Sequence, residues 1–326
     1  MKLDDTISDF APIIIPTLCR FEHLKRCLSS LAQCTWANQT VIYIGLDYPL
    51  KKSHEEGYVR IKKYLSTSNI GGCFKELNVL YREVNYGAEK NLKDLVDLVG
   101  KQYDRWIVSE DDNVFSPNFL DYLNKGLVLF EKDPYVLAIN GYCHFYPFKK
   151  DDNTFFRESA TFSAWGYACW KEKVNNLKSI TYKDFRMHLW NFSTFRKFVK
   201  YGRRRMAQFL SLCCKNNGDV IYMTDNILSV WMILNNLDVV VPTISLVRNC
   251  GIDSSGISFS DASARLRKLH HEQVISKNVD FEFKGSGFEY YYDNIQIYKK
   301  NDYDQISFYQ LMIVIIKTFV KILTGK

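Results

Sequence analysis

Residues 105 to 113 read RWIVSEDDN, a short apolar run that ends in three consecutive acidic residues. A run of this length is typical of a strand buried in a parallel sheet. Three adjacent carboxylates repel one another unless positive charge neutralises them, and hard divalent cations prefer carboxylate oxygens. Acids before a helix also stabilise its positive end, so a helix entry at Pro117 is the plainer alternative. The stretch favours a site for a metal ion that also holds a diphosphate.

Strands and helices are expected to alternate along this half of the chain. Apolar runs predict strands at 11–16, 41–47, 77–82 and 105–113. Apolar residues at helical spacing predict helices over 24–31, 58–65 and 92–99, and Pro117 begins a fourth that runs to Phe130. The alternation predicts a doubly wound α/β sheet. Because ligands bind beyond the carboxyl ends of such strands, we expect Arg20, Asp47 and Glu110 to Asp112 to gather there.

From about residue 140 the pattern becomes irregular and aromatic. A basic stretch with aromatic residues follows at 195–206, for which a solvated face is the default and membrane contact the functional alternative. A helix is expected at 225–236, a strand at 238–241 and a loop rich in Gly and Ser at 251–261. Because no linker separates the halves, we expect one catalytic domain with a soft boundary near residue 140.

Composition excludes several classes of protein. The chain has 326 residues, of which 47% are hydrophobic and 24% charged, so a disordered or collagen-like chain is excluded. The net charge of +7 is too dispersed for a dedicated nucleic-acid binder. The nine cysteines lack the paired spacing of a zinc site, and the N-terminal stretch lacks the apolar run of a signal peptide. Both features predict a cytoplasmic protein with reduced thiols.

Three further side chains are candidates for a site, each with a structural alternative. Arg20 follows the first expected strand and would pair with a phosphate, or would be a surface loop charge. Asp47 ends the second strand and would bind a base or ribose, or would serve as a turn residue. Asp225 stands where a helix begins and would act as a catalytic base, as a helix cap, or as both.

Four segments together resemble one enzyme family. They are PTLCRFEHLKRCLSSL at 16–31, IVSEDDNVFSPNFLDYL at 107–123, TFSAWGYACW at 161–170 and the stretch at 225–258, which begins DNILSVW and ends GIDSSGIS. In this order they resemble the N-acetylglucosaminyltransferase I family and its bacterial relatives, nucleotide-sugar glycosyltransferases of the GT-A fold. The resemblance covers roughly residues 11 to 275. It implies a nucleotide-sugar-binding half at 1–140 and an acceptor-binding and catalytic half at 141–300.

The resemblance also implies a role for each matching residue. Asp112 would coordinate Mn²⁺ or Mg²⁺ bridging the donor diphosphate, and Asp225 would be the general base of an inverting transfer. The remaining matches would bind the donor: Arg20 its phosphate, Asp47 its uracil, Glu110 and Asp111 its ribose and sugar, and Trp165, Gly166 and Ser258 other parts of it. Gly251 and Gly256 would be hinges of a loop that closes over the donor.

The function expected from these features is the synthesis of a bacterial surface polysaccharide, which would be O-antigen, capsule or lipooligosaccharide. A hexosyl- or N-acetylhexosaminyltransferase would move a sugar from a nucleotide-diphosphate donor, a UDP-sugar, to a glycan acceptor. One alternative is a sugar nucleotidyltransferase, although PTLCRFEH lacks the Gly-rich loop such enzymes use. The other is a non-catalytic basic protein that binds RNA or membranes through 195–206.

The C-terminal stretch at 305–326 predicts an amphipathic helix with a wide apolar side. Twelve uncharged residues separate Asp304 from Lys317, too few for a span that needs about 20. The helix would lie in the interface of an anionic membrane, or dock onto protein. A lipid-linked acceptor would favour the membrane. We therefore expect a cytoplasmic protein attached peripherally to the inner face of the cytoplasmic membrane, with no nucleic-acid partner.

Overall fold

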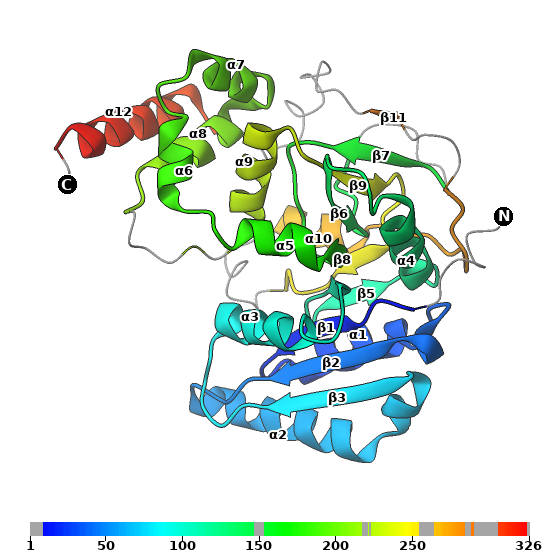
Figure 1. Ribbon diagram of the computed structural model, residues 1–326. Coiled ribbons are helices and arrows are strands. Elements are labelled where there is room, and N and C mark those ends of the chain that lie inside the picture. The colour runs from blue at the N-terminus through cyan, green and yellow to red at the C-terminus, as the bar shows by residue number, and fades with distance from the viewer. Residues whose placement is uncertain are drawn as a thin grey trace.

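The computed structural model describes residues 9–146, 153–216, 221, 223–253, 264–283, 288–289 and 306–324, and its first half has the predicted alternation (Figure 1). Its parallel strands are β1 (Ile13–Thr17), β2 (Val41–Leu46), β3 (Glu76–Tyr81) and β4 (Arg105–Val108). Between them lie α1 (Phe21–Leu31), α2 (Lys52–Thr67) and α3 (Ala88–Val99), with short turns η2 (Ala37–Gln39) and η3 (Asn69–Cys73). The strands lie in the order β3-β2-β1-β4, so the strand order reverses at β1.

Helices cover both faces of this part of the sheet. Successive side chains of a strand point to opposite faces. Ile13 and Ile15 accordingly pack in one apolar cluster with Leu28 of α1, and Ile14 packs in a second cluster with Leu95 of α3. All three isoleucines are fully buried. The sequence of β1 is a continuous apolar run because neither of its faces meets water. Helices on both faces confirm the predicted doubly wound sheet in this half.

The second half of the chain extends the same sheet. Its strands are β6 (Val136–Asn140), β7 (Phe155–Glu158), β8 (Tyr167–Trp170), β9 (Asp238–Pro242) and β11 (Phe288–Glu289). With the first four they make, within the described residues, a sheet of nine strands in the order β11-β7-β9-β6-β8-β4-β1-β2-β3, with β8 antiparallel to both β4 and β6. The strand predicted at 238–241 is confirmed by β9, whereas the irregular, aromatic pattern of this half predicted none of the other four strands. The position expected as a soft boundary lies at the end of β6, inside one continuous sheet.

Two further strands leave the main sheet and build the rim of the candidate site. β5 (Asn113–Phe115) follows the acidic triplet and pairs antiparallel with β10 (Val247–Asn249). α4 (Phe119–Leu129) then begins close to the predicted position. Phe119 and Val247 of these elements are fully buried, which fixes the ladder against the core. The ladder brings residues near 249 to the end of β4, although they lie far apart in sequence.

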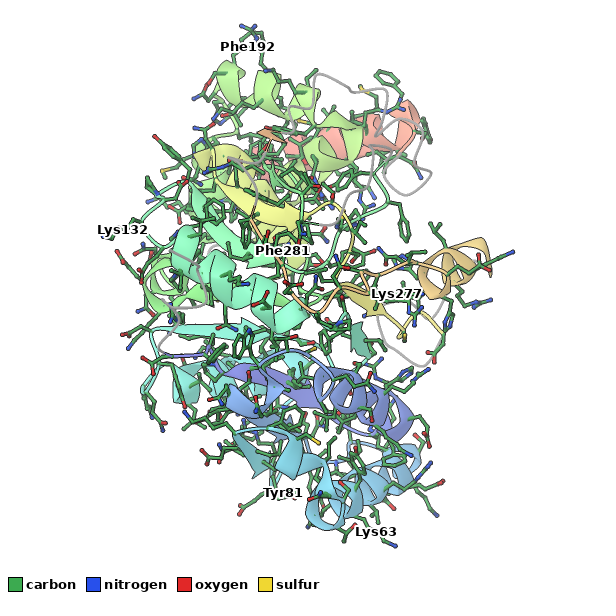
Figure 2. All side chains as sticks on the ribbon, turned by 90° about the vertical axis from the view of Figure 1, so that its right-hand side faces the viewer. Lys63, Tyr81, Lys132, Phe192, Lys277 and Phe281 are labelled. Carbon is green, nitrogen blue, oxygen red and sulfur yellow. The ribbon has the colours of Figure 1, made fainter. Side chains whose placement is uncertain are left out.

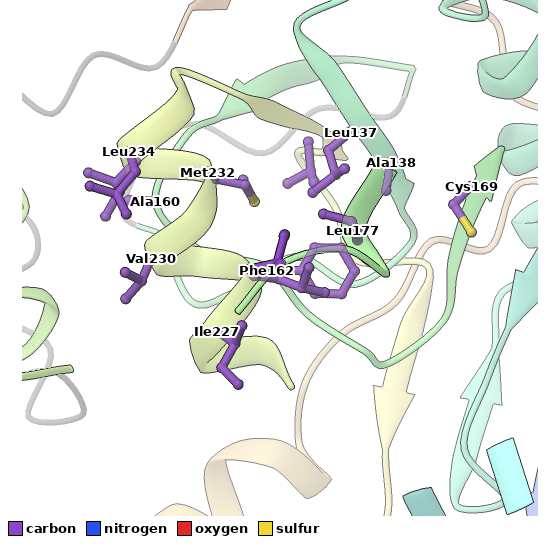
Figure 3. Close-up of a cluster of buried hydrophobic side chains, with 14 of the residues drawn as sticks. Leu137, Ala138, Ala160, Phe162, Cys169, Leu177, Ile227, Val230, Met232 and Leu234 are labelled. Carbon is purple, nitrogen blue, oxygen red and sulfur yellow. The ribbon is translucent and has the colours of Figure 1, made fainter. Parts of the chain in front are cut away.

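Helices α6 (Tyr182–Met187), α7 (Phe192–Lys200), α8 (Gly202–Cys213) and α9 (Asp225–Asn235) form the upper part of Figure 1. α5 (Lys171–Leu177) and α10 (Ala264–His271) lie nearer the strands. α9 confirms the helix predicted at 225–236. Figure 3 shows its side chains Ile227 and Met232 in one cluster with Leu137, Phe162 and Leu177. This packing fixes the orientation of α9 and therefore the place of its first residue.

The C-terminal segment forms α12 (Phe308–Thr324), as predicted, and it packs against α8. Thr318 is 1% exposed, and its hydroxyl donates to the carbonyl oxygen of Val314 at 2.8 Å. The ring of Phe319 lies 5.6 Å from that of Trp190, which precedes α7. Docking on the protein is therefore observed for one side of this helix. Within the described residues, none of the helices has both the length and the apolarity needed to cross a membrane.

Candidate functional site

The carboxyl ends of β1 and β4 are neighbours, and Arg20 meets the acidic triplet there. Arg20 is the residue just before α1, and its guanidinium forms ion pairs with Asp111 and Asp112. The Arg20 Nη1 to Asp112 Oδ2 distance is 2.7 Å. Thr17, the last residue of β1, donates its hydroxyl to Asp111 Oδ2 at 2.7 Å. The predicted meeting of Arg20 with the acidic triplet is thus observed. Thr17 also belongs to this cluster, although the sequence around it gives no sign of that role.

Asp112 is held from its other side by the β5–β10 ladder. This ladder pairs Asn113 with Asn249, and the Asn249 side chain donates to Asp112 Oδ1 at 2.6 Å. The backbone N–H of Cys250 donates to the carbonyl oxygen of Asp112 at 2.9 Å. The next residue, Gly251, lies so close that a Cβ there would be 1.9 Å from Asp112 Oδ2. The chain therefore needs glycine at 251 for steric reasons, in addition to any role as a hinge.

Negative charge exceeds positive charge in this cluster. Burial, followed by repulsion from Asp112, Asp225 and Asp111, raises the pKa of Glu110 well above its usual range. Burial also raises the pKa of Asp112, with Asp111 adding to it and Arg20 opposing it. Burial disfavours the Arg20 charge, yet the two aspartates raise the pKa of Arg20 above its ordinary value. One guanidinium does not neutralise this group, so additional positive charge would be stabilised there.

Asp225 is the first residue of α9, where the predicted helix begins. The residue before the helix is Thr224, which makes no side-chain capping hydrogen bond. The Asp225 carboxylate instead accepts from the backbone N–H of Ala164 at 3.1 Å and is partly exposed. Burial raises the pKa of Asp225 to about 6, while the Ala164 N–H and the charge of Arg205 oppose the rise. A carboxylate with this pKa is a better proton acceptor than an ordinary aspartate.

Asp225 and the triplet belong to one electrostatic site. The charge of Asp225 contributes to the raised pKa of Glu110, although 114 residues separate them in the sequence. Arg205 of α8 is 8% exposed, and its guanidinium donates to the Thr161 hydroxyl at 2.9 Å and to the Gln208 side chain at 2.7 Å. These bonds hold the Arg205 charge near Asp225. The basic stretch at 195–206 therefore includes a buried arginine that belongs to the site.

Trp165 and Gly166 lie directly after the Ala164 contact with Asp225. Gly166 has a φ of +77°, and a Cβ there would lie 2.9 Å from the side chain of Val247. The partly buried Trp165 ring meets Tyr142 edge-on at 4.7 Å and His270 edge-on at 5.4 Å between ring centroids. This segment therefore places an aromatic wall beside the candidate base. A ring of this kind offers an apolar face to a sugar or a base.

Asp47 lies at the end of β2, where its carboxylate holds the loop before α3. It is 3% exposed and accepts from the backbone N–H of Tyr86 at 2.7 Å and of Gly87 at 2.8 Å. The Asn85 side chain and the Tyr48 backbone N–H also donate to it. Asp47 thus shapes the sheet edge by fixing this loop. Asp47 was expected to gather with Arg20 and the triplet, and its contacts among the described residues are instead with this loop.

The loop that begins at Gly251 is described as far as residue 253. Asp253 Oδ2 lies 3.0 Å from His23 Nε2 of α1, so the loop leaves the site across the start of that helix. Ser258 and Gly256 lie outside the described residues.

The donor set of the cluster fits a divalent cation that also binds a substrate phosphate. Within the described ranges, no three His, Cys, Asp or Glu side chains converge to hold an ion by themselves. Mg²⁺ at diphosphate sites usually takes only one or two protein carboxylates and completes its shell with phosphate and water oxygens. The pKa values of Glu110 and Asp112 are raised, so a nearby cation would stabilise the ionised form of both side chains. These two side chains are the candidate ligands.

Comparisons with known proteins identify no family for this chain. No protein-family model and no curated protein matches it. Among solved structures, it is similar to residues 1–349 of S. aureus TarS, with a TM-score of 0.35 and 14% identity over 53% of this chain and 50% of that one. For S. aureus TarS in a second structure, the TM-score is 0.38 with 10% identity over 72% of this chain and 37% of that one. This chain therefore spans half or less of the TarS chains it matches.

A third structure is of an enzyme with its ligands. It is the mannosyltransferase PcManGT from Pyrobaculum calidifontis in complex with GDP-Man and Mn²⁺, with a TM-score of 0.37 and 9% identity over 81% of this chain and 83% of that one. TM-scores below 0.5 are too low to establish a common fold. The functional interpretation therefore depends on the residues of this chain.

Proposed function

We propose that this chain is an inverting, metal-dependent glycosyltransferase of the GT-A type, similar to the N-acetylglucosaminyltransferase I family. Its donor is a nucleotide-diphosphate sugar, a UDP-sugar, and it transfers a hexosyl or N-acetylhexosaminyl group. One observation carries the proposal. An arginine and an acidic triplet at the carboxyl ends of adjacent strands lie in one electrostatic site with Asp225, a partly exposed carboxylate whose pKa is raised to about 6.

The donor occupies the sheet edge at the switch point in this proposal. Asp112 would hold Mn²⁺ or Mg²⁺, which would neutralise charge on the diphosphate and on the leaving nucleotide. Arg20 adds a guanidinium for the phosphate oxygens. Trp165 and Gly166 form the floor below the sugar, Asp111 and Glu110 face the ribose and sugar, and Asp47 is assigned to the uracil side. Ser258 belongs to the loop that closes over the donor.

Transfer then needs one proton acceptor and one stabilised leaving group. The Asp225 carboxylate takes the proton of the acceptor hydroxyl while that oxygen attacks the anomeric carbon. The bond from the anomeric carbon to the diphosphate oxygen breaks as the new glycosidic bond forms on the opposite face, which inverts the configuration. The negative charge that develops on the nucleoside diphosphate is stabilised by Arg20. The Ala164 hydrogen bond keeps the Asp225 carboxylate oriented during this step.

The acceptor in this proposal is a glycan of a bacterial surface polysaccharide. The resemblance of four ordered segments to bacterial relatives supports that assignment, and a lipid-linked glycan is the acceptor class that a surface-attached enzyme would meet. A sugar nucleotidyltransferase and a non-catalytic RNA-binding protein make different products or none. Product analysis therefore separates the three functions.

The test is turnover of a panel of nucleotide sugars by the purified full chain. We expect release of a nucleoside diphosphate from one donor, stimulated by a glycan acceptor, abolished by EDTA and restored by Mn²⁺. Anomeric analysis of the glycoside by NMR would report the inverted configuration. Formation of pyrophosphate from a sugar phosphate and a nucleoside triphosphate would instead identify a nucleotidyltransferase. RNA binding without turnover of any donor would favour the non-catalytic basic protein.

The pH dependence of transfer should report the raised pKa of Asp225. A base must be ionised to take a proton, so kcat/KM for the acceptor should fall about tenfold per pH unit below about pH 6 and level off above it. The measurement is the initial rate at low acceptor concentration from acid to neutral pH, with donor saturation checked at each pH. A profile that stays flat down to pH 4.5 would contradict the assignment of Asp225 as the base.

A further inference from the structure

The docked helix α12 leaves part of its apolar side exposed. Thr318, Leu311 and Ile315 face α8 or its core cluster. At 100° per residue, the opposite side carries Tyr309, Met312, Ile316 and Val320, which are 74%, 36%, 57% and 53% exposed. Docking on α8 therefore buries one side of α12 and leaves the apolar stripe from Tyr309 to Val320 in contact with solvent.

Further exposed apolar residues lie before and at the start of α7, and one of them, Trp190, contacts α12. Trp190 is 69% exposed and touches Phe319 of α12, and Phe192 at the start of α7 is 78% exposed. Met187 at the end of α6 is 64% exposed. Figure 2 shows Phe192 at one end of the molecule, with Tyr81 and Lys63 at the other. These side chains, with the α12 stripe, are called the α7–α12 face below.

Basic residues accompany the apolar ones on this face. On α7, Arg196 and Lys200 share the exposed side with Phe192 and Val199, while Phe198 is buried on the other side. Lys317 is exposed at the border of the α12 stripe. The sequences of α7, α8 and α12 contain lysine and arginine but no aspartate or glutamate. The α7–α12 face is therefore apolar at its centre and positive at its border.

This combination fits a lipid surface better than a protein partner or open solvent. Tryptophan and tyrosine prefer the membrane interface because each has an apolar ring and a polar group. Aliphatic side chains on an amphipathic helix enter the boundary of the acyl chains, and basic side chains nearby are attracted to anionic headgroups. We propose that the α7–α12 face binds an anionic bilayer surface, with α12 lying along the interface rather than crossing it.

The orientation of the molecule agrees with this attachment. In Figure 1, α12 lies toward the side to which the arrows of β2 and β3 point, and the donor edge is formed at the carboxyl ends of the strands. A bilayer along the α7–α12 face would lie on that side of the molecule. The inference does not depend on the proposed activity, because it follows from exposed side chains outside the site.

The test is binding of the full chain to vesicles of phosphatidylcholine with and without phosphatidylglycerol. Wild type should sediment with the anionic vesicles, and added salt should weaken this binding. Ile316→Glu should reduce the affinity by about tenfold or more, because it removes an aliphatic side chain that the membrane would bury and adds a charge that anionic headgroups repel. The matched control is Val59→Glu on α2, which changes the charge equally at a 60% exposed site at the far end of the molecule.

A second variant, on a different helix, distinguishes loss of membrane contact from local unfolding of α12. Phe192→Ser lies on α7 and should also weaken vesicle binding, so a loss confined to Ile316→Glu, with lowered Tm, would point to disturbed docking of α12 and overturn the proposal. Equal binding by wild type and both variants would overturn it as well. Light scattering tests whether a second copy of the chain binds this face instead of a membrane. A dimer that Ile316→Glu dissociates, without vesicle binding by wild type, would identify the face as a contact between two copies.

Discussion

Asp225→Asn should lower kcat for sugar transfer by about 10²-fold or more, while the KM for the donor changes little. Asparagine has nearly the same shape and still accepts the Ala164 N–H, but it does not take a proton from the acceptor hydroxyl. The measurement is steady-state release of nucleoside diphosphate at saturating donor, with donor affinity from titration calorimetry. Because the substitution keeps the hydrogen bond, we expect a change in the free energy of unfolding of only about 1 kcal/mol.

The control for this prediction is an acid that caps a helix away from the site. Asp184 forms a capping box with Thr181 at the start of α6, so Asp184→Asn should lower stability without lowering kcat. If Asp225→Asn instead reduced activity only in proportion to its folded fraction, the helix-capping interpretation would be the better one. The contact with Ala164 in a distant segment already favours a role beyond capping.

The first half of the fold was predictable because local patterns and burial agree there. β1 is buried on both faces, so its sequence is a continuous apolar run, and α1 presents its apolar residues at helical spacing. Parallel strands place their carboxyl ends at one edge, which is why Arg20 and the triplet could be expected to meet. The ion pair with Asp112 is the direct evidence for that meeting.

Apart from α9 and β9, the strands of the second half were not predictable because they are short and their sequences lack a distinctive period. β7 and β8 are aromatic strands of only four residues each, and their neighbours in the sheet come from distant parts of the chain. Asn249 contacts Asp112 only because β10 pairs with β5, and Arg205 influences Asp225 only because α8 packs beside α9. A single sequence contains no local signal for such contacts.

The C-terminal helix itself was predictable from the sequence, but its contacts were not. Its apolar pattern predicted α12 within a few residues, yet docking and membrane binding were treated as alternatives. The structure places one side against α8 and leaves Ile316 on the other side exposed. The apolar side of α12 is wider than the surface that α8 covers. The helix can therefore dock on α8 and contact a membrane at the same time. Which residues belong to each contact depends on the position of α8, which the helical period alone does not specify.

Asp112→Asn should also abolish most transfer, by about 10²-fold or more, and should remove the stimulation by Mn²⁺. The side chain is 5% exposed and lies between Arg20 and Asn249, so the variant changes charge at a defined point of the cluster. Burial raises the pKa of Asp112, which means that folding makes its ionised form less favourable than it is in water. A neutral amide relieves that penalty but loses the ion pair, so the two effects oppose each other and Tm should change little.

The measurements are Mn²⁺ titration of activity and direct Mn²⁺ binding in the presence of nucleoside diphosphate. The matched control is Asp94→Asn, which removes a carboxylate paired with the largely buried Arg82 at 2.5 Å outside the site and should leave both measurements unchanged. Full, metal-independent turnover by Asp112→Asn would contradict the metal assignment. If Mn²⁺ binding survived while transfer was lost, the carboxylate would act by holding Arg20 for the leaving phosphate. Glu110 would then be the ligand to replace, because its raised pKa makes it the other carboxylate that a cation would stabilise.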